Sequence, residues 1–280
     1  MNPSARTRVI ALLGDPVSHS LSPHFQNAAL RAAGLNGVYV AMRCTAAELP
    51  GLLTGLTGAG GGGNVTVPHK ELAARTVERR TETVEATGAC NTFWMEDGRV
   101  CGDNTDVEGV SAAVRALLGR SAAGARVLLL GAGGSARAVL HALAGEGAER
   151  IVILNRTPSR AEGLIARGGR ARTSVSVAPS AADLAGEQFD LAINTTSLGL
   201  TEADDLPLAV GGAIGFAAAL DLVYARGGTR WVREAAGQGI PAADGTEMLL
   251  MQGAASFRRW WGTEPPVAAM RAALAAAAAA

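Results

Sequence analysis

The sequence lacks the features of several protein classes. Its three cysteines, Cys44, Cys90 and Cys101, include no CxxC pair, which argues against a disulfide framework or a zinc site, and no metal is expected. Basic and acidic residues both total 25, so no large charged field points to nucleic acid or an anionic membrane. No segment approaches the roughly 18 consecutive apolar residues of a membrane span. Residues 1–8 lack the apolar stretch of a secretory signal, and a cytoplasmic protein is predicted.

The chain is long enough for two domains. Its 280 residues exceed the roughly 100 to 200 residues typical of one domain. Apolar runs rich in branched residues alternate with alanine-rich segments of helical period over residues 9–57, and again from residue 126 onward. This alternation predicts an α/β fold in which helices cover parallel sheets. A helix predicted over 107–118 marks the boundary, and two further helices are predicted over 246–261 and 267–280.

A glycine-rich motif follows the strand predicted at 127–130. Gly131, Gly133 and Ala136 form G-x-G-x-x-A at the start of a predicted helix. In a Rossmann-like domain the first glycine permits the tight turn, the second lets backbone amides approach a pyrophosphate, and the small third residue lets helix pack on strand. The alternative is a glycine-rich turn that binds nothing. The expected cofactor-binding residues of this turn are Gly131, Ala132, Gly133, Gly134 and Ser135.

The end of the next strand carries positive charge where an NAD enzyme usually carries a carboxylate. That carboxylate lies about 20 residues after the glycine motif and accepts hydrogen bonds from the ribose hydroxyls. Here the position holds Asn155, Arg156 and Thr157, with Arg160 one turn later. Two guanidinium groups would bind the 2′-phosphate of NADP. Arginines after a strand are usually solvated surface charges, but two at helical spacing favour NADP as the cofactor.

Two polar clusters of the first half contain candidates for proton transfer. Lys70 comes just after a strand that ends at proline, and Asp106 directly precedes the helix predicted at 107–118. Oxidation of a secondary alcohol needs a group that takes the hydroxyl proton and a partner that positions it; a lysine beside a carboxylate suits these roles. The alternative is that Lys70 and Asp106 form an ordinary surface ion pair or never meet. Asp103, in the same cluster, could simply cap or brace the turn.

Together, these and other motifs resemble shikimate dehydrogenases. The resemblance follows the family's order along nearly the whole chain, and no single short motif carries it. It rests on residues 14–23, 64–70, 88–92, 102–106, 131–134, 155–157, 194–199, 221–224, 244–245 and 248–252. It implies an NADP-dependent enzyme of the aromatic amino-acid (chorismate) pathway that interconverts shikimate and 3-dehydroshikimate.

The resemblance also assigns domains and residues. It implies an N-terminal α/β substrate domain of residues 1–107 plus 246–280, to which the C-terminal helices return, and a Rossmann-like NADP domain of residues 108–245. Lys70 and Asp106 would be the catalytic pair, and Thr195 and Gly245 would lie near the cofactor. The implied substrate-binding residues are Ser20, Ser22, Thr66, Asn91, Tyr224 and Gln252.

Some alternatives stay open at this point. His69 stands where the family usually has an aromatic or aliphatic residue. Its side chain is expected to point away from that of Lys70, because neighbours on an extended segment alternate, although it could instead enter the proton network. A quinate or aminoshikimate dehydrogenase is the nearest other function, and a non-catalytic NADP-binding regulator is one of a different class. A homodimer is a possible assembly.

Overall fold

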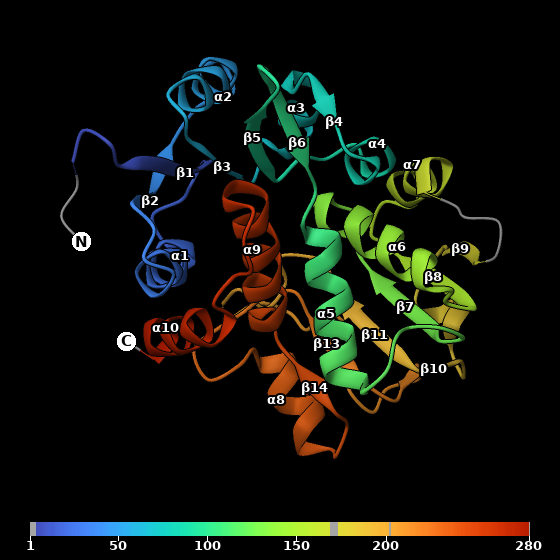
Figure 1. The fold of residues 1–280 in the computed structure, drawn as a ribbon. Coiled ribbons are helices and arrows are strands. Elements are labelled where there is room, and N and C mark those ends of the chain that lie inside the picture. Colours follow the sequence, from blue (N-terminus) through green and yellow to red (C-terminus); the bar gives the residue numbers. More distant parts are fainter. Residues whose placement is uncertain (1–3, 169–172, 202, 280) are drawn as a thin grey trace. The chain divides into compact units, whose positions relative to one another are not determined.

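The chain divides into two compact units. In the computed structural model, which describes residues 4–168, 173–201 and 203–279, unit 1 comprises Met1–Gly109 and Leu249–Ala280, and unit 2 comprises Val110–Met248. Each unit contains a six-stranded sheet together with helices (Figure 1). The α/β class is therefore confirmed, and so is the return of the C-terminal helices to the first part of the chain.

Unit 1 is built around a mixed sheet. Its N-terminal elements are β1 (Arg8–Gly14), α1 (Ser22–Ala32), β2 (Gly37–Arg43), α2 (Leu49–Gly58), β3 (Gly62–Val65), α3 (Lys70–Thr76), β4 (Arg79–Arg80), α4 (Glu82–Thr87), β5 (Thr92–Glu96) and β6 (Arg99–Asp103). The strand order is β2-β1-β3-β5-β6-β4. The predicted parallel pairing holds for β1, β2 and β3, but β5 runs antiparallel to β3 and β6. The antiparallel β5–β6 pair is a hairpin, in which Asp97 and Gly98 take φ angles of 51° and 72° and so reverse the chain within two residues.

The carboxyl ends of β1 and β3 bring two site segments to one edge of this sheet. Leu13 pairs with Val65, and the next residue, Thr66, donates its backbone N–H to the Leu13 carbonyl at 2.8 Å. A Cβ on Gly14 would collide with the Thr66 methyl group, so glycine is required there. The loops that carry Ser20 and Thr66 therefore start side by side.

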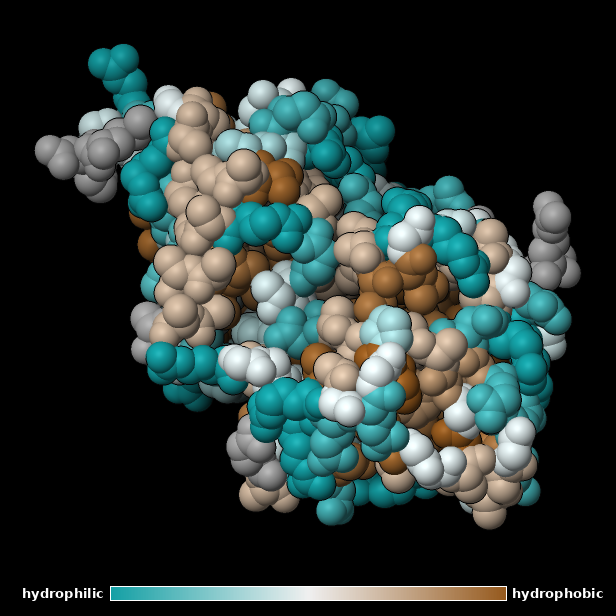
Figure 2. All heavy atoms as spheres, turned by 90° about the horizontal axis from the view of Figure 1, so that it is seen from below, coloured by the Kyte–Doolittle hydropathy of each residue, from teal (hydrophilic) through white to brown (hydrophobic). Residues whose placement is uncertain are grey.

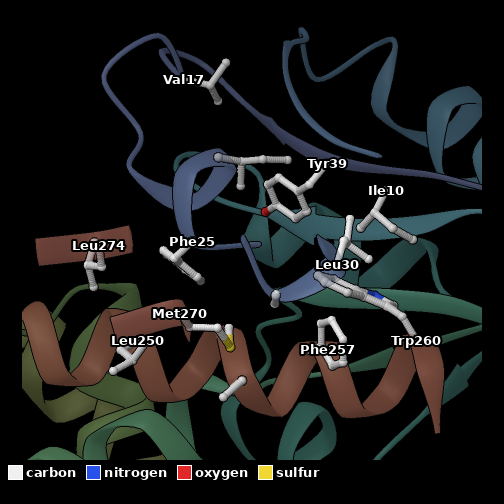
Figure 3. Packing of buried hydrophobic residues seen from close by; sticks show 13 residues of the cluster. Ile10, Val17, Phe25, Leu30, Tyr39, Leu250, Phe257, Trp260, Met270 and Leu274 are labelled. Atoms are coloured by element: carbon white, nitrogen blue, oxygen red, sulfur yellow. The ribbon is translucent and has the colours of Figure 1, made fainter. Parts of the chain in front are cut away.

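Two C-terminal helices, α9 (Thr246–Trp261) and α10 (Val267–Ala279), complete the core of unit 1. In Figure 3, Phe257 and Trp260 of α9 pack with Phe25 of α1 and Tyr39 of β2, and all four are almost fully buried. Full burial of a large apolar side chain contributes roughly 1.5–3 kcal/mol. At Gly253 the helix approaches α1 so closely that a Cβ would lie 2.5 Å from the Phe25 ring. This packing fixes the position of α9 within unit 1.

Unit 2 is a parallel, doubly wound sheet. Helix α5 (Asp106–Leu118) leads the chain from unit 1 into unit 2, whose other elements are β7 (Arg126–Leu130), α6 (Gly134–Glu146), β8 (Arg150–Leu154), α7 (Pro158–Gly168), β9 (Ser174–Ala178), η1 (Ala182–Leu184), β10 (Gln188–Phe189), β11 (Leu191–Asn194), β12 (Gly215–Phe216), β13 (Ala219–Asp221), α8 (Arg230–Gly237) and β14 (Ala242–Ala243). The order β14-β13-β11-β7-β8-β9 reverses direction between β7 and β11. In such sheets ligands bind beyond the carboxyl ends of the strands at this reversal. The glycine motif follows β7, and Thr195 follows β11.

The surface mixes polar and apolar residues. On the face drawn in Figure 2, hydrophilic residues lie between hydrophobic ones, which form no continuous band. Among the described residues, no helix combines the length and the apolar character needed to cross a membrane.

Candidate active site

Lys70 and Asp106 meet in unit 1. Lys70 opens α3 and Asp106 opens α5, and Lys70 Nζ donates to Asp106 Oδ2 at 2.6 Å. The two side chains are only 20% and 6% exposed. An exposed pair in this geometry would contribute little, but a pair removed from water interacts strongly and is costly to break. The surface-pair alternative is therefore wrong.

Lys70 is also the single lysine of the chain, since every other residue in the total of 25 Lys and Arg is arginine. An arginine stays protonated at all ordinary pH values, whereas an ammonium can release its proton. The chain thus uses guanidinium groups for every other cationic side chain and an amine at this one position. This signal was available in the sequence and supports a proton-transfer role for Lys70.

Asn91 and Gln252 join the same cluster. Asn91 lies just before β5, and its Nδ2 donates to Asp106 Oδ1 at 2.8 Å and to Gln252 Oε1 at 3.4 Å. Gln252 comes from α9, where its Nε2 donates to the Leu249 carbonyl. Both oxygens of Asp106 are thus engaged, one by Lys70 Nζ and one by an amide. Four predicted residues that lie far apart in the sequence therefore share one set of hydrogen bonds.

Ser20 and Ser22 lie together at the start of α1. The Ser22 backbone N–H donates to Ser20 Oγ at 3.2 Å, and the Ser22 side chain is buried beside the Tyr39 hydroxyl. Tyr39 donates in turn to Asn64 Oδ1 at 2.8 Å. Burial raises the pKa of Tyr39, so its hydroxyl keeps its proton. Sequence reasoning missed Tyr39 and Asn64, which link the serines to the rest of the site.

His69 lies outside the Lys70–Asp106 pair. Its ring is buried, and Nε2 lies 2.8 Å from the Cys44 carbonyl oxygen at the end of β2. The ring thus ties the loop before α3 to the neighbouring strand. This agrees with the expectation that its side chain and that of Lys70 point in different directions.

Asp103 braces the site from β6. Its carboxylate accepts hydrogen bonds from the hydroxyl groups of Thr81 and Thr83, and Arg259 of α9 donates to it at 2.8 Å. Burial alone would raise the pKa of Asp103, but these hydrogen bonds and the guanidinium outweigh burial and lower it. The interaction holds α9, which carries Gln252, against the strand that leads to Asp106.

The variant Asp103→Asn is expected to lower the free energy of unfolding by about 2 kcal/mol at pH 7. A carboxylate with a lowered folded-state pKa stabilises the protein above the unfolded-state pKa of about 4, and this contribution is lost as the pH falls through the folded-state pKa. Urea unfolding of wild type and variant should therefore differ at pH 7, and the difference should be smaller at an acidic pH below the unfolded-state pKa.

Asp97→Asn is the matched control for that experiment. The Asp97 side chain is 85% exposed, and asparagine tolerates the positive φ of this hairpin position. It should unfold like wild type at both pH values. An equal loss for Asp103→Asn at both pH values would show that the ionised carboxylate is not what matters.

In unit 2 the glycine motif forms an open turn. Gly131 has a φ of 103°, and a Cβ there would lie 2.7 Å from Thr195 Oγ1, so only glycine fits. Gly133 and Gly134 instead have open space where a Cβ would stand. Helix α6 starts at Gly134 without a side-chain cap, so its first amides can bind an anion. The turn also includes Ala132 and Ser135, both half-buried.

The predicted phosphate-binding arginines are exposed. Asn155 Nδ2 donates to the Thr157 carbonyl at 2.7 Å and closes the turn after β8. Arg156 and Arg160 flank this turn, and neither guanidinium has an ion-pair partner among the described residues. Free guanidinium groups beside a glycine-rich turn fit the 2′-phosphate of NADP.

Three further predicted residues of unit 2 have clear local surroundings. The Thr195 hydroxyl donates to the Leu130 carbonyl at 2.8 Å, which joins the ends of β11 and β7. A Cβ on Gly245 would collide with the Leu222 carbonyl, so this glycine has a packing reason of its own. Tyr224 is half-buried, and burial raises the pKa of its hydroxyl. The ligand contacts of these residues stay predictions.

Three family models match the chain. They are described as the shikimate dehydrogenase substrate binding domain over residues 12–93, shikimate / quinate 5-dehydrogenase over residues 113–198, and the shikimate 5′-dehydrogenase C-terminal domain over residues 245–275. The first and last fall on unit 1 apart from residues 245–248, and the middle one falls on unit 2.

Individual relatives match over almost the full length. A shikimate dehydrogenase (NADP(+)) from Brucella abortus is 38% identical over 260 residues, which is 91% of this chain and 89% of the relative. The crystal structure of shikimate 5-dehydrogenase from Thermus thermophilus in complex with NADP(H) and shikimate superposes with a TM-score of 0.85 at 36% identity, covering 96% of this chain and 99% of that one. The Listeria monocytogenes shikimate 5-dehydrogenase in complex with shikimate and NAD has a TM-score of 0.85 at 27% identity, with 98% of both chains covered.

Proposed function

This chain belongs to the shikimate dehydrogenase family, and from that premise we propose that it interconverts shikimate and 3-dehydroshikimate with NADP, as a step of aromatic amino-acid biosynthesis. The buried cluster of Lys70, Asp106, Asn91 and Gln252 is the observation that supports this most directly. A protein that only sensed NADP would have no use for a buried amine paired with a carboxylate.

Lys70 exchanges the proton of the reacting hydroxyl in this proposal. When shikimate is oxidised, the hydroxyl proton must leave as the hydride leaves carbon, and the Lys70 amine accepts it. In the reverse direction the ammonium returns the proton to the carbonyl oxygen. Asp106 keeps Lys70 Nζ in place through its 2.6 Å contact, and Asn91 holds the second oxygen of that carboxylate. Two side chains thus fix the position of the Lys70 nitrogen.

The remaining polar residues of unit 1 bind the substrate. The Ser20 and Ser22 hydroxyls donate to the carboxylate of shikimate, while Thr66, Asn91 and Gln252 contact its ring hydroxyls. The sheet edge supports the placement of Ser20 and Thr66, because their loops start from adjacent strands. Tyr224 of unit 2 is assigned to the substrate by family resemblance.

Unit 2 would hold NADP, which when bound would supply the hydride acceptor for the alcohol carbon. The amides of the turn from Gly131 to Ser135 bind the pyrophosphate, and Asn155, Arg156, Thr157 and Arg160 bind the adenosine end with its 2′-phosphate. Thr195 lies near the cofactor, and Gly245 lies near the nicotinamide. A substrate domain of residues 1–107 plus 246–280 and an NADP domain of residues 108–245 are part of this proposal, as are the cytoplasm as the compartment and a homodimer as the assembly.

Initial rates with shikimate and with quinate, each paired with NADP and with NAD, test the function. The absorbance of the reduced nicotinamide should rise fastest with shikimate and NADP, because the turn after β8 offers guanidinium groups and no carboxylate to the ribose. A preference for quinate would move the protein to the sister activity. The absence of turnover with every pair would favour the non-catalytic regulator.

A further inference from the structure

A group of buried polar side chains in unit 1 has no role in the reaction described above. We call it the buried polar cluster: Tyr39, Asn64, Thr92, Thr105 and Ser256, each at most 5% exposed. Buried polar side chains are costly unless they are hydrogen-bonded, and a fully connected network of them fixes one arrangement. The cluster can therefore fix the orientation of a neighbouring side chain to which it is hydrogen-bonded.

The cluster determines which way the Asn91 amide points. Asn91 Oδ1 lies 2.8 Å from Thr92 Oγ1, 2.8 Å from the Thr105 backbone nitrogen and 3.1 Å from Thr105 Oγ1. The backbone N–H donates to this oxygen and each hydroxyl can do so, so the amide nitrogen must face the other side, where Asp106 and Gln252 accept from it. A flipped amide would turn its oxygen toward the Asp106 carboxylate and its nitrogen toward the donors. Asn91 can serve the catalytic carboxylate in one orientation only.

Ser256 connects this arrangement to α9. Its hydroxyl donates to the Gln252 carbonyl one turn earlier, at 2.9 Å. A hydroxyl has one proton, so Ser256 Oγ acts as an acceptor toward its other neighbours. These neighbours are Thr92 Oγ1 at 2.8 Å, Thr105 Oγ1 at 3.0 Å and Asn64 Nδ2 at 3.0 Å.

One oxygen therefore orients both threonines that face Asn91. Whichever threonine donates to Ser256 Oγ, the other is free to donate to Asn91 Oδ1. Without Ser256 Oγ, the two threonine protons and an amide proton of Asn64 compete for fewer acceptors. The hydrogen bonds that orient the Asn91 amide are then only one of several possible arrangements, because a buried donor without an acceptor costs free energy and favours rearrangement.

We propose that Ser256 is a positioning residue of the reaction, which acts through Thr92 and Thr105 to hold the Asn91 amide against Asp106. Ser256 touches neither Lys70 nor the reacting hydroxyl in this scheme. The inference rests on the proposed dehydrogenase activity, because its effect is read in the turnover of shikimate.

Three variants of Ser256 isolate the hydroxyl. Ser256→Ala removes it, Ser256→Cys keeps the unbranched shape but offers a weak acceptor, and Ser256→Thr keeps the oxygen. We expect Ser256→Ala and Ser256→Cys to lower kcat about tenfold, the rate equivalent of one lost buried hydrogen bond, with an unchanged KM for NADP. Ser256→Thr should recover most of kcat where it folds. Should Ser256→Thr fail to fold, the other two variants and the double variant below still decide.

Thr57→Val is the matched structural control. Thr57 is also buried on a helix, and its hydroxyl also donates one turn back, to the Leu53 carbonyl of α2 at 2.7 Å. Its loss should lower the melting temperature about as much as Ser256→Ala does and leave kcat at the wild-type value. Equal kcat values for Thr57→Val and Ser256→Ala would assign Ser256 a structural role only and overturn the proposal.

A double variant shows whether Ser256 acts through Asn91. In an Asn91→Ala background the further change Ser256→Ala should have almost no effect on kcat, because the amide that it orients is gone. Losses that multiply in full would contradict the proposal. If the wild type itself turns over no shikimate with NADP, the proposed function fails together with the inference, whereas an active wild type with an equally active Ser256→Ala variant rejects the inference alone.

Discussion

Lys70→Met should lower kcat for shikimate oxidation about a thousandfold while leaving the dissociation constant of NADP unchanged. Methionine keeps the length of the side chain but can neither take up nor return a proton. NADP is assigned to unit 2, so its binding does not depend on a residue of unit 1. Stopped-flow or steady-state absorbance gives kcat, and quenching of protein fluorescence gives the NADP affinity.

Lys70→Arg is the control for charge. It leaves a cation beside the buried Asp106 carboxylate, which protects the fold, but a guanidinium does not release its proton. It should therefore fold like wild type and be almost as inactive as Lys70→Met. If Lys70→Arg keeps most of the activity, Lys70 acts by charge alone and proton transfer belongs to another group.

Replacing both Arg156 and Arg160 by alanine should lower kcat/KM for NADP about a hundredfold and leave kcat/KM for NAD nearly unchanged. Each guanidinium is exposed and free to pair with a phosphate that NAD does not have. The ratio of the two kcat/KM values, measured with saturating shikimate, is the readout. This ratio is insensitive to a general loss of active protein.

Arg120→Ala is the control for this pair, since Arg120 is another exposed arginine and it donates to nearby backbone carbonyls. It should leave the ratio at the wild-type value. A parallel loss with NADP and NAD in the double variant would mean that the arginines bind the part common to both cofactors. If kcat/KM falls with neither cofactor, the two arginines are solvated surface charges.

Much of the fold and the pairing of Lys70 with Asp106 could be predicted because both depend on local sequence signals. The helices expected at 246–261 and 267–280 appear as α9 and α10 within one residue, since long periodic segments bury one face. Lys70 and Asp106 each open a helix a few residues after a strand of the same sheet, β3 and β6, so the sheet brings them together. The hairpin at Asp97 and Gly98 was missed, although this dipeptide is a strong turn signal.

The buried polar cluster could not be predicted in the same way. Ser256 meets Thr92 and Thr105 across more than 150 positions of sequence, and only the packing of α9 against unit 1 brings them together. The one usable signal is that Ser256 follows Gln252 by four residues and so lies on the same face of the helix. Gly245 differs from Ser256, because family resemblance already implies a ligand contact there. The structure shows in addition that a Cβ at this position would collide with the Leu222 carbonyl.

Lys70, the single lysine of the chain, can report directly on the proposed active site. A protein grown with isotopically labelled lysine would give one side-chain signal in a magnetic resonance spectrum, with no overlap to resolve. That signal would come from the amine in the ion pair with Asp106, and its chemical shift would follow protonation as pH, substrate or cofactor changes. No reporter group has to be introduced by mutation, because the sequence already carries a single lysine.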